Sequence, residues 1–246
     1  MPDVVVLFLA ACGTALATGL GAVPVFYLGS HAAQLTPWLL GFAAGVMGVA
    51  AVAGLLIPAG EEGSAAEVAG GLLAGAALLW LARRHLDPDL EFMGRSGPRA
   101  RTSALVFLVL FVHSLPEGFA VGTAFASERA GLSLFVIVAI AVQNVPEGTS
   151  VAIPMAAAGF SRTRQFWAAV ATSLPQPIGA LVAYFLVEEV SALLPFSLAF
   201  AAGAMLVLIA VELLPDAYAG GRRLGPSAGA GLGAALMLAL SFALGV

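Results

Sequence analysis

The sequence is poor in charge, contains no lysine and has a single cysteine, Cys12. Charged residues make up 10% of the 246 positions, against about 25% in soluble domains. A soluble globule of this size needs more charge at its surface, and a nucleic-acid-binding protein needs a basic patch. One cysteine excludes an internal disulfide framework. These absences exclude a cytosolic enzyme, a disordered protein and a nucleic-acid partner.

Hydrophobic residues make up 61% of the chain, and the mean hydropathy is +1.01. A membrane-spanning helix needs about 20 apolar residues, and eight stretches have roughly that length. Glycine and alanine are frequent in them, as in closely packed membrane helices, and the alternation of membrane strands is missing. The sequence predicts an all-α polytopic membrane protein, one transmembrane domain over residues 1–246 in contact with the lipid bilayer. Its spans are expected at residues 4–28, 38–59, 65–82, 103–126, 131–158, 165–187, 193–218 and 226–246.

The arginines lie almost entirely on one side of these spans. Nine of the ten fall in or beside the loops after spans three (residues 83–102), five and seven, and only Arg129 falls on the other side. This bias predicts a cell (inner) membrane protein with both termini on the extracytoplasmic side, and the start of the chain lacks the basic region of a cleaved signal peptide. His31 and His85 are expected in loops or at the membrane interface. The outer glutamates are interpreted either as an acidic mouth that concentrates cations or as solvated loop ends: Glu61, Glu62, Glu128, Glu188 and Glu189.

An internal repeat is visible when the chain is compared with itself at an offset of 158 residues. Residues 42–47 then align with residues 200–205, and the glycines of span three align with those of span eight. The first three spans (residues 1–82) thus resemble the last three (residues 165–246). Five helices separate the two starting points, so the repeat is inverted in the membrane. With spans four and five (residues 103–158) between the copies, the arrangement is 3+2+3, and inverted repeats around a midplane polar site are typical of transporters.

Two related motifs lie midway along spans four and five. Residues 113–118 read His-Ser-Leu-Pro-Glu-Gly, and residues 143–148 read Gln-Asn-Val-Pro-Glu-Gly. Each proline removes a helical donor and clashes with the carbonyl four residues back, so kinks are expected that expose carbonyl oxygens to an ion or to water.

The polar residues of these motifs have helical spacing. His113 and Glu117 are four residues apart, as are Gln143 and Glu147, and Asn144 precedes Glu147 by three, so each set shares a helix face. A charged carboxylate at this depth costs about 2.5–3.5 kcal/mol, and no arginine lies at this depth in any span. The two glutamates must therefore be protonated, hydrated or paired with a mobile cation. The absence of a fixed positive charge favours a cation site.

Four further residues are weaker candidates. Met47 offers a thioether, although a membrane methionine is usually core packing. Glu212, in the last turns of span seven with Asp216, is either a gate or accessory ligand or a snorkelling acid. Gln176, between two prolines, marks a broken start to span six, as a cap or as a ligand.

The candidate ligands indicate the class of ion. One imidazole, two carboxylates and an amide suit a borderline divalent metal such as Zn²⁺, with Fe²⁺, Mn²⁺, Co²⁺ and Cd²⁺ as alternatives. Mg²⁺ or Ca²⁺ would favour oxygen ligands alone. The ion is expected as transported substrate, with no organic cofactor and no ATP-binding motif.

These motifs resemble the ZIP family (Zrt/Irt-like divalent-metal transporters), most closely its compact prokaryotic members. The resemblance rests on Pro-Glu-Gly at 116–118 and 146–148, on residues 41–47, and on residues 201–205 leading to the sequence Glu-Leu-Leu-Pro at 212–215. It implies a non-enzymatic zinc transporter that moves metal into the cytoplasm, commonly as a homodimer. It also implies an elevator-like motion of helices one, four, five and six against the others. The metal ligands implied are His113, Glu117, Gln143 and Glu147, with Met47 and Glu212 as accessory positions.

The sequence departs from the family pattern at three positions. Ser114 stands where Asn is usual, Asn144 where an acid or Asn occurs, and Gln176 where Glu is usual. These positions help to form a second metal site in some members, so a single metal site is expected here, with Asn144 close to it. Two alternatives are a metal-sensing or scaffold protein with little transport and an intramembrane metalloenzyme. The second is disfavoured by the single central histidine and by the absence of a His-Glu-x-x-His motif.

Overall fold

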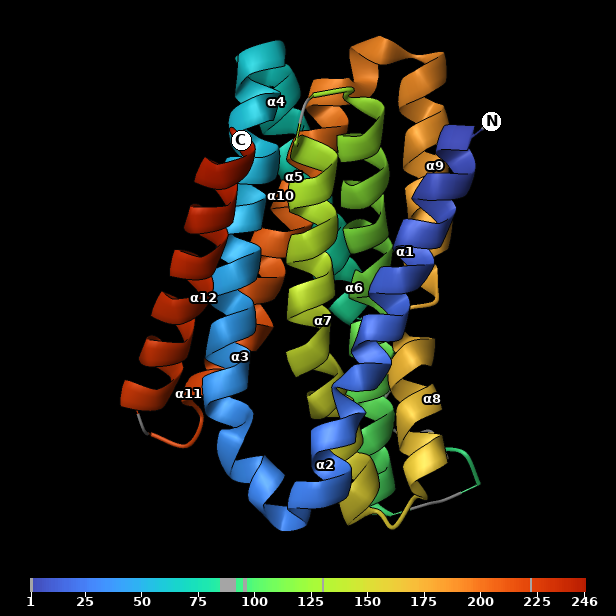
Figure 1. The fold of residues 1–246 in the computed structure, drawn as a ribbon, viewed down its shortest axis with the longest axis vertical. Helices are drawn as coiled ribbons and strands as arrows, with labels where there is room; N and C mark the ends of the chain where they lie inside the picture. Colours follow the sequence, from blue (N-terminus) through green and yellow to red (C-terminus); the bar gives the residue numbers. More distant parts are fainter. Residues whose placement is uncertain (1, 85–91, 95–96, 130, 222) are drawn as a thin grey trace.

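The protein is a bundle of helices that run along one common direction (Figure 1). The computed structural model describes residues 2–84, 92–94, 97–129, 131–221 and 223–246. Its regular elements are all helices. Singly, or joined to the helical segment that follows, they form eight spans that are long and apolar enough to cross a membrane. This confirms the prediction of an all-α polytopic membrane protein. His85, Arg95 and Arg222 of the predicted loops lie outside the described residues.

The eight spans lie close to their predicted positions, with the largest difference at the start of the second, predicted at residue 38 and observed at Ala32. The first four are α1 (Pro2–Leu20) with α2 (Ala22–Leu28); α3 (Ala32–Val49) with η2 (Ala50–Leu56) and α4 (Ile57–Glu62); α5 (Ala65–Arg84); and α6 (Pro98–Ala126). The last four are α7 (Leu132–Ala157); α8 (Arg162–Thr172) with α9 (Pro175–Glu189); α10 (Leu194–Leu208) with η4 (Ile209–Leu213) and α11 (Leu214–Tyr218); and α12 (Leu224–Leu244). Short 3₁₀ turns, η1 (Gly29–His31) and η3 (Ser191–Leu193), precede α3 and α10, and His31 lies in the first of them.

Prolines, one helix break and two π-helical segments occur within the spans. Helices α6 and α7 run through Pro116 and Pro146 without a break. The sixth span is interrupted between α8 and α9, just before Gln176, as its flanking prolines predict. Two segments, η2 and η4, are π-helical, and they occupy matching places under the 158-residue offset. Such segments are frequent at functional sites.

The helices form two groups by their packing (Figure 1). In the first group, α6 packs on α9, and α1 packs on α7 and α8; we call α1, α2 and α6–α9 the central bundle. In the second group, α3 packs on α12 and α5 on α10; we call α3–α5 and α10–α12, with η2 and η4, the flanking bundle. The two bundles meet mainly where α3 and η2 contact α7 and where α10 contacts α6.

Glycines hold helices together within each bundle. In the flanking bundle, a Cβ at Gly75 of α5 would collide with the Phe200 carbonyl oxygen of α10, and a Cβ at Gly233 of α12 would collide with the Phe42 carbonyl oxygen of α3. In the central bundle, Gly148 of α7 lies in the same way against the backbone of α1. Without a hydrophobic drive between helices in lipid, such close approach of backbones is a main source of stability.

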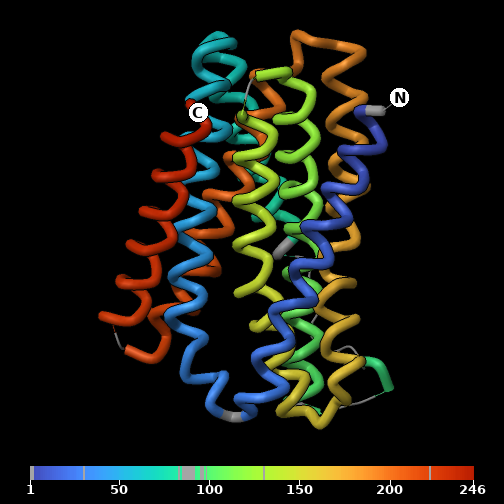
Figure 2. The backbone as a smooth tube through the Cα atoms, in the orientation of Figure 1, coloured from blue at the N-terminus to red at the C-terminus, as the bar shows by residue number. Residues whose placement is uncertain are grey.

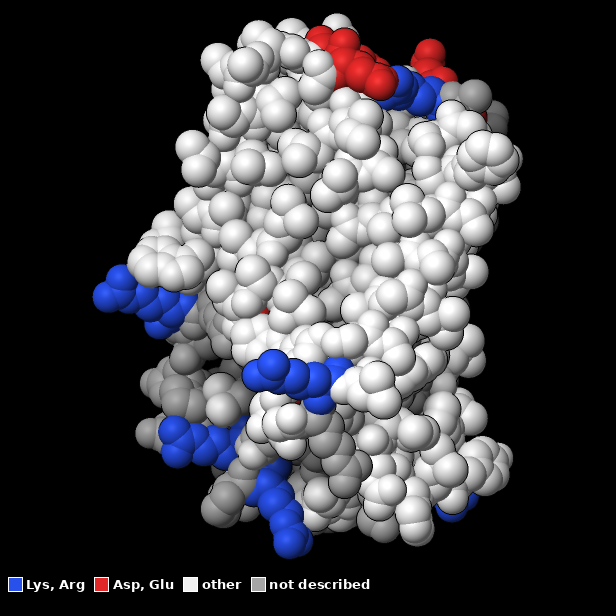
Figure 3. All heavy atoms as spheres, turned by 90° about the vertical axis from the view of Figure 1, so that its left-hand side faces the viewer, with Lys and Arg blue, Asp and Glu red and all other residues white. Residues whose placement is uncertain are grey.

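The two ends of the molecule differ in charge (Figure 3). Arginines lie at one end, where α5 ends and α6, α8 and α12 begin; we call it the arginine-rich end: Arg84, Arg99, Arg101, Arg162, Arg164 and Arg223. The opposite end carries Arg129, Asp3, Glu67 and the predicted outer glutamates, and we call it the acidic end: Glu61, Glu62, Glu128, Glu188 and Glu189. The first and last helices both have their chain-terminal ends at the acidic end (Figure 2).

Candidate metal centre

Three potential metal ligands from adjacent helices meet in the interior of the central bundle. His113 and Glu117 project from one face of α6, and Glu147 projects from α7. Each offers a ligand atom, and these atoms all lie within 4.8 Å of one another. The side chains are buried, with exposed fractions of 2%, 1% and 2%. The motifs on α6 and α7 thus come together because these helices pack side by side with their Pro-Glu-Gly segments at similar depth.

Several atoms of this cluster lack a hydrogen-bond partner among the described residues. They are both ring nitrogens of His113, Oε1 of Glu147 and Oε1 of Gln143. The His113 Nε2 atom is 3.8 Å from Glu147 Oε2. A buried polar atom without a partner is costly, and imidazole nitrogens and carboxylate oxygens are the atoms that Zn²⁺ binds. The cluster therefore has the chemistry of a cation site.

The second half of the site is a network of amides around Glu117. Gln143 Nε2 donates to Glu117 Oε1 (2.5 Å), and Gln176 Nε2 donates to Glu117 Oε2 (2.8 Å). Asn144 Nδ2 donates to Gln176 Oε1 (3.2 Å) and to the Thr14 carbonyl oxygen (2.7 Å), while Thr14 Oγ1 also donates to Gln176 Oε1 (2.8 Å). Both Glu117 oxygens thus accept from neutral amides. The network joins α1, α6, α7 and the start of α9 into one buried unit.

The sequence alone does not predict a role for Thr14, and it allows Gln176 to be either a helix cap or a metal ligand. Both side chains are buried, at 1% and 0% exposed. The only signal is a polar residue inside an apolar span. It is weak because a threonine hydroxyl can bond to its own helix, and the single hydroxyl proton of Thr14 is shared between the Ala11 carbonyl oxygen and Gln176 Oε1, each at 2.8 Å.

Of the two accessory candidates, Met47 lies in the apolar core and Glu212 lines a cavity. Met47 of α3 is fully buried (0% exposed) in the apolar core that α3 shares with α6, α7 and α10. Glu212 of η4 lines a cavity of 410 Å³ that also reaches Glu147, Ser150 and Asp216. This cavity lies between the two bundles on the side of the arginine-rich end, where α3 and α6 begin. It gives Glu147 an opening toward that end.

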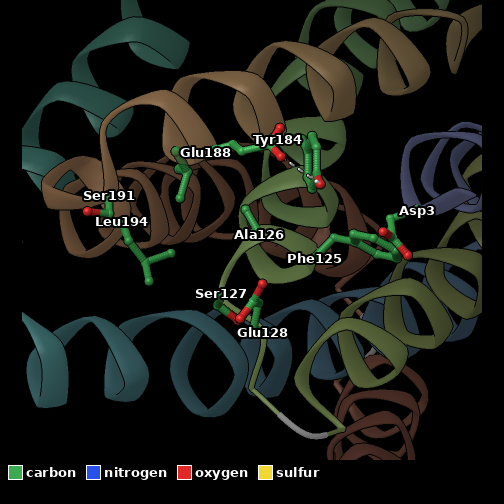
Figure 4. Close-up of a pocket in the computed structure, with 10 residues that line it drawn as sticks. Asp3, Phe125, Ala126, Ser127, Glu128, Tyr184, Glu188, Ser191 and Leu194 are labelled. Carbon is green, nitrogen blue, oxygen red and sulfur yellow. Dashed lines mark hydrogen bonds between the residues drawn. The ribbon is translucent and has the colours of Figure 1, made fainter. Parts of the chain in front are cut away.

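At the acidic end, a separate pocket of 520 Å³ lies between the ends of α1, α6 and α9 (Figure 4). Asp3, Glu128 and Glu188 line it, and Tyr184 donates a hydrogen bond to Glu188 Oε1 at 3.4 Å. Two of the five outer glutamates therefore share one pocket, while Glu61 and Glu62 lie beside Arg129. An acidic mouth that concentrates cations stays a prediction, and Glu128 and Glu188 of that predicted mouth line this pocket.

Comparison with known proteins gives consistent matches. The profile of the family described as ZIP Zinc transporter matches residues 93–241. The chain is 35% identical over 243 residues to "Zinc transporter GufA" of Myxococcus xanthus, covering 93% of this chain and 95% of that protein. It is 36% identical over 242 residues to "Zinc transporter ZIPB" of Bordetella bronchiseptica, covering 93% of this chain and 78% of that protein. A longer protein of Arabidopsis thaliana is 38% identical over 211 residues, which are 83% of this chain but only 33% of that protein.

Proposed function

Since the chain belongs to the ZIP zinc transporter family, we propose that it transports a divalent transition-metal ion, zinc foremost, through the buried site of His113, Glu117 and Glu147. The observation that carries the proposal is the meeting of these three buried side chains, in which both ring nitrogens of His113 and Oε1 of Glu147 lack a hydrogen-bond partner among the described residues. Two carboxylates balance the charge of a divalent ion, and no arginine among the described residues pairs with them. The relatives are named as transporters, in agreement with a protein that is not an enzyme.

The proposed direction is into the cytoplasm. Glu147 lines the 410 Å³ cavity toward the arginine-rich end, and arginine-rich loops are retained on the cytoplasmic side of a membrane. An ion that leaves the cluster by this route passes Glu212 and Asp216. We therefore propose that metal is released through this cavity in the conformation described, with both termini on the other side of the cell (inner) membrane.

Alternating access is proposed to arise from movement of the central bundle against the flanking bundle. Support comes from the pairing of glycine contacts under the 158-residue offset, where Gly75 with Phe200 corresponds to Gly233 with Phe42. Equivalent contacts in opposite directions are what an inverted repeat requires, and such repeats supply the two symmetry-related states of many transporters. The glycine contacts also make each bundle a rigid unit, because backbone packed on backbone leaves no room to slide.

Transport is tested with purified protein in proteoliposomes. Zinc entering the vesicles faster than in protein-free vesicles, and saturating with zinc concentration, supports the proposal. A protein that binds zinc at equilibrium but moves none would instead be the metal sensor or scaffold of the alternative. The same purified protein reports on the predicted homodimer, by its mass in detergent.

A single zinc ion per chain is expected at the central site. The Gln176 amide lies 2.8 Å from Glu117 Oε2 and takes the place in which a second cation would neutralise that oxygen. Its Oε1 atom accepts from Asn144 and Thr14, so the amide cannot turn its oxygen toward Glu117 without breaking both bonds. Elemental analysis after equilibrium dialysis should give one zinc per chain for the parent protein.

Gln176→Glu is the matched variant for measuring the number of zinc ions per chain, because it keeps the size and shape of the side chain and replaces its amide by a carboxylate. We expect it to bind additional zinc, since two adjacent carboxylates then need a second counter-ion. A parent protein that already holds two central ions would contradict the single-site expectation.

A further inference from the structure

The boundary between the two bundles is open at one end and closed at the other. Toward the arginine-rich end, the 410 Å³ cavity separates α3 and α11 from α6 and α7. Toward the acidic end, the same boundary is filled by buried apolar side chains, among them Leu55 of η2, Val121 of α6 and Phe135 of α7, each 0% exposed. Among the described residues, the central site is therefore reached from the arginine-rich end, while apolar side chains cover it toward the acidic end.

Arg129 ties the bundles together at the closed end. It lies in the connection between α6 and α7 of the central bundle. Its Nη2 atom donates to Glu61 Oε2, and its Nε atom lies 3.6 Å from Glu62 Oε1; both glutamates end α4 of the flanking bundle. One guanidinium thus reaches two carboxylates through two different nitrogens, a fixed fork of donors that a lysine does not have.

Gly131, which directly precedes α7, is held against the flanking bundle by its backbone. Gly131 has φ of +79°, a conformation that favours glycine. A Cβ there would meet the carbonyl oxygen of Leu244 in α12 at 2.6 Å, so Gly131 packs directly on the flanking bundle. The other close glycine–backbone contacts of the described residues join helices of the same bundle.

We propose that Arg129, Glu61 and Glu62 form an ionic clasp that keeps the acidic end of the metal pathway closed while the arginine-rich end is open. The inference rests on the proposed transport by alternating access. When the central bundle moves to open the site at the acidic end, Arg129 has to leave both glutamates. The exposed fractions are 35% for Arg129, 55% for Glu61 and 32% for Glu62, so solvent screens the pairs and their effect on the equilibrium is modest, about two- to fivefold.

The clasp is tested by the accessibility of two cysteine reporters in a Cys12→Ala background. Ala124→Cys reports on the closed end, because Ala124 is 1% exposed within the apolar core. Ser150→Cys reports on the open cavity. In proteoliposomes of known orientation, a membrane-impermeant thiol reagent is applied to each side. With Arg129→Gln we expect modification of the first reporter to accelerate about two- to fivefold, and that of the second to slow.

Control variants separate the clasp from a general charge effect. Glu61→Gln should shift both reporters in the same direction as Arg129→Gln. Glu189→Gln removes one negative charge at the same end, as Glu61→Gln does, but it should leave the modification rates of both reporters unchanged. Arg129→Lys should lie between parent and Arg129→Gln. If Arg129→Gln leaves both rates at the parent value, or if Glu189→Gln shifts them equally, the clasp is refuted. Such a result would leave zinc uptake by the parent protein intact, whereas failure of the proposed function would appear as absent uptake in the parent itself.

Discussion

Zinc uptake is expected to be lost when Glu147 is replaced by glutamine, while the protein still inserts and folds. Gln keeps the size of the side chain but removes one of the two carboxylate charges that would balance a divalent ion. In the described part of the chain no arginine pairs with Glu147, and the His113 Nε2 atom lies 3.8 Å from Glu147 Oε2. When the divalent ion is bound to Glu147→Gln, one of its two positive charges is left without a carboxylate in the bundle interior. Such a buried charge costs several kcal/mol. The loss should exceed the roughly 10–100-fold effect of changing an outer-shell partner.

Initial rates of ⁶⁵Zn uptake into proteoliposomes, normalised to inserted protein, measure this effect. Glu117→Gln should be equally inactive, because Glu117 is the other buried carboxylate. Glu67→Gln is the matched control, since Glu67 is exposed in the first turn of α5, away from the cluster and outside the set of outer glutamates, and it should keep the parent rate. Normal uptake by both Glu117→Gln and Glu147→Gln would refute the site.

Adding a single methyl group at Gly75 is expected to destabilise the protein strongly. A Cβ at this position collides with the Phe200 carbonyl oxygen and crowds the backbone nitrogen of Ala204. Backbone atoms cannot rotate away as a side chain would, so α5 and α10 must separate. Overpacking of this kind costs about 1–3 kcal/mol, and in lipid the lost contact between small residues is a main term in helix association.

Thermal unfolding in detergent measures the prediction. Gly75→Ala should lower the melting temperature, and Gly233→Ala should lower it comparably, because Gly233 meets the Phe42 carbonyl oxygen in the corresponding way. Gly231→Ala is the control on α12, since a Cβ there would meet nothing within 4 Å. It should be neutral or stabilising by up to about 1 kcal/mol through helix propensity. Equal melting temperatures for all three variants would show that the glycine contacts do not hold the bundles together.

The spans could be predicted from the sequence because their signal is local. Apolar runs of membrane length, ended by arginines or acids, need no knowledge of tertiary packing, and the observed spans follow them closely. The second span begins at Ala32 and not at the predicted residue 38, because Thr36 and Pro37 interrupt the apolar pattern without interrupting the helix. The π-helical segments in spans two and seven have no such signature, because their sequences are ordinary apolar runs.

The candidate site was predictable in part, for a similar reason. His113, Glu117 and Glu147 were visible as polar residues with helical spacing in the middle of apolar spans. The bonds from Gln176 and from Asn144 to Thr14 were not, because they depend on how α1 and α9 pack against α6 and α7. Arg129 was seen only as an exception to the charge bias, and its contacts with Glu61 and Glu62 depend on tertiary packing.

The position of the bound ion is the most direct test of the proposed site. Crystals of the zinc-loaded protein, measured on both sides of the zinc absorption edge, would locate it by anomalous scattering. We expect one strong peak in the central bundle, within about 2.0–2.2 Å of an imidazole nitrogen of His113 and of carboxylate oxygens of Glu117 and Glu147. Zinc bound only in the pocket at the acidic end, with the central cluster empty, would contradict a transport site built from these three residues.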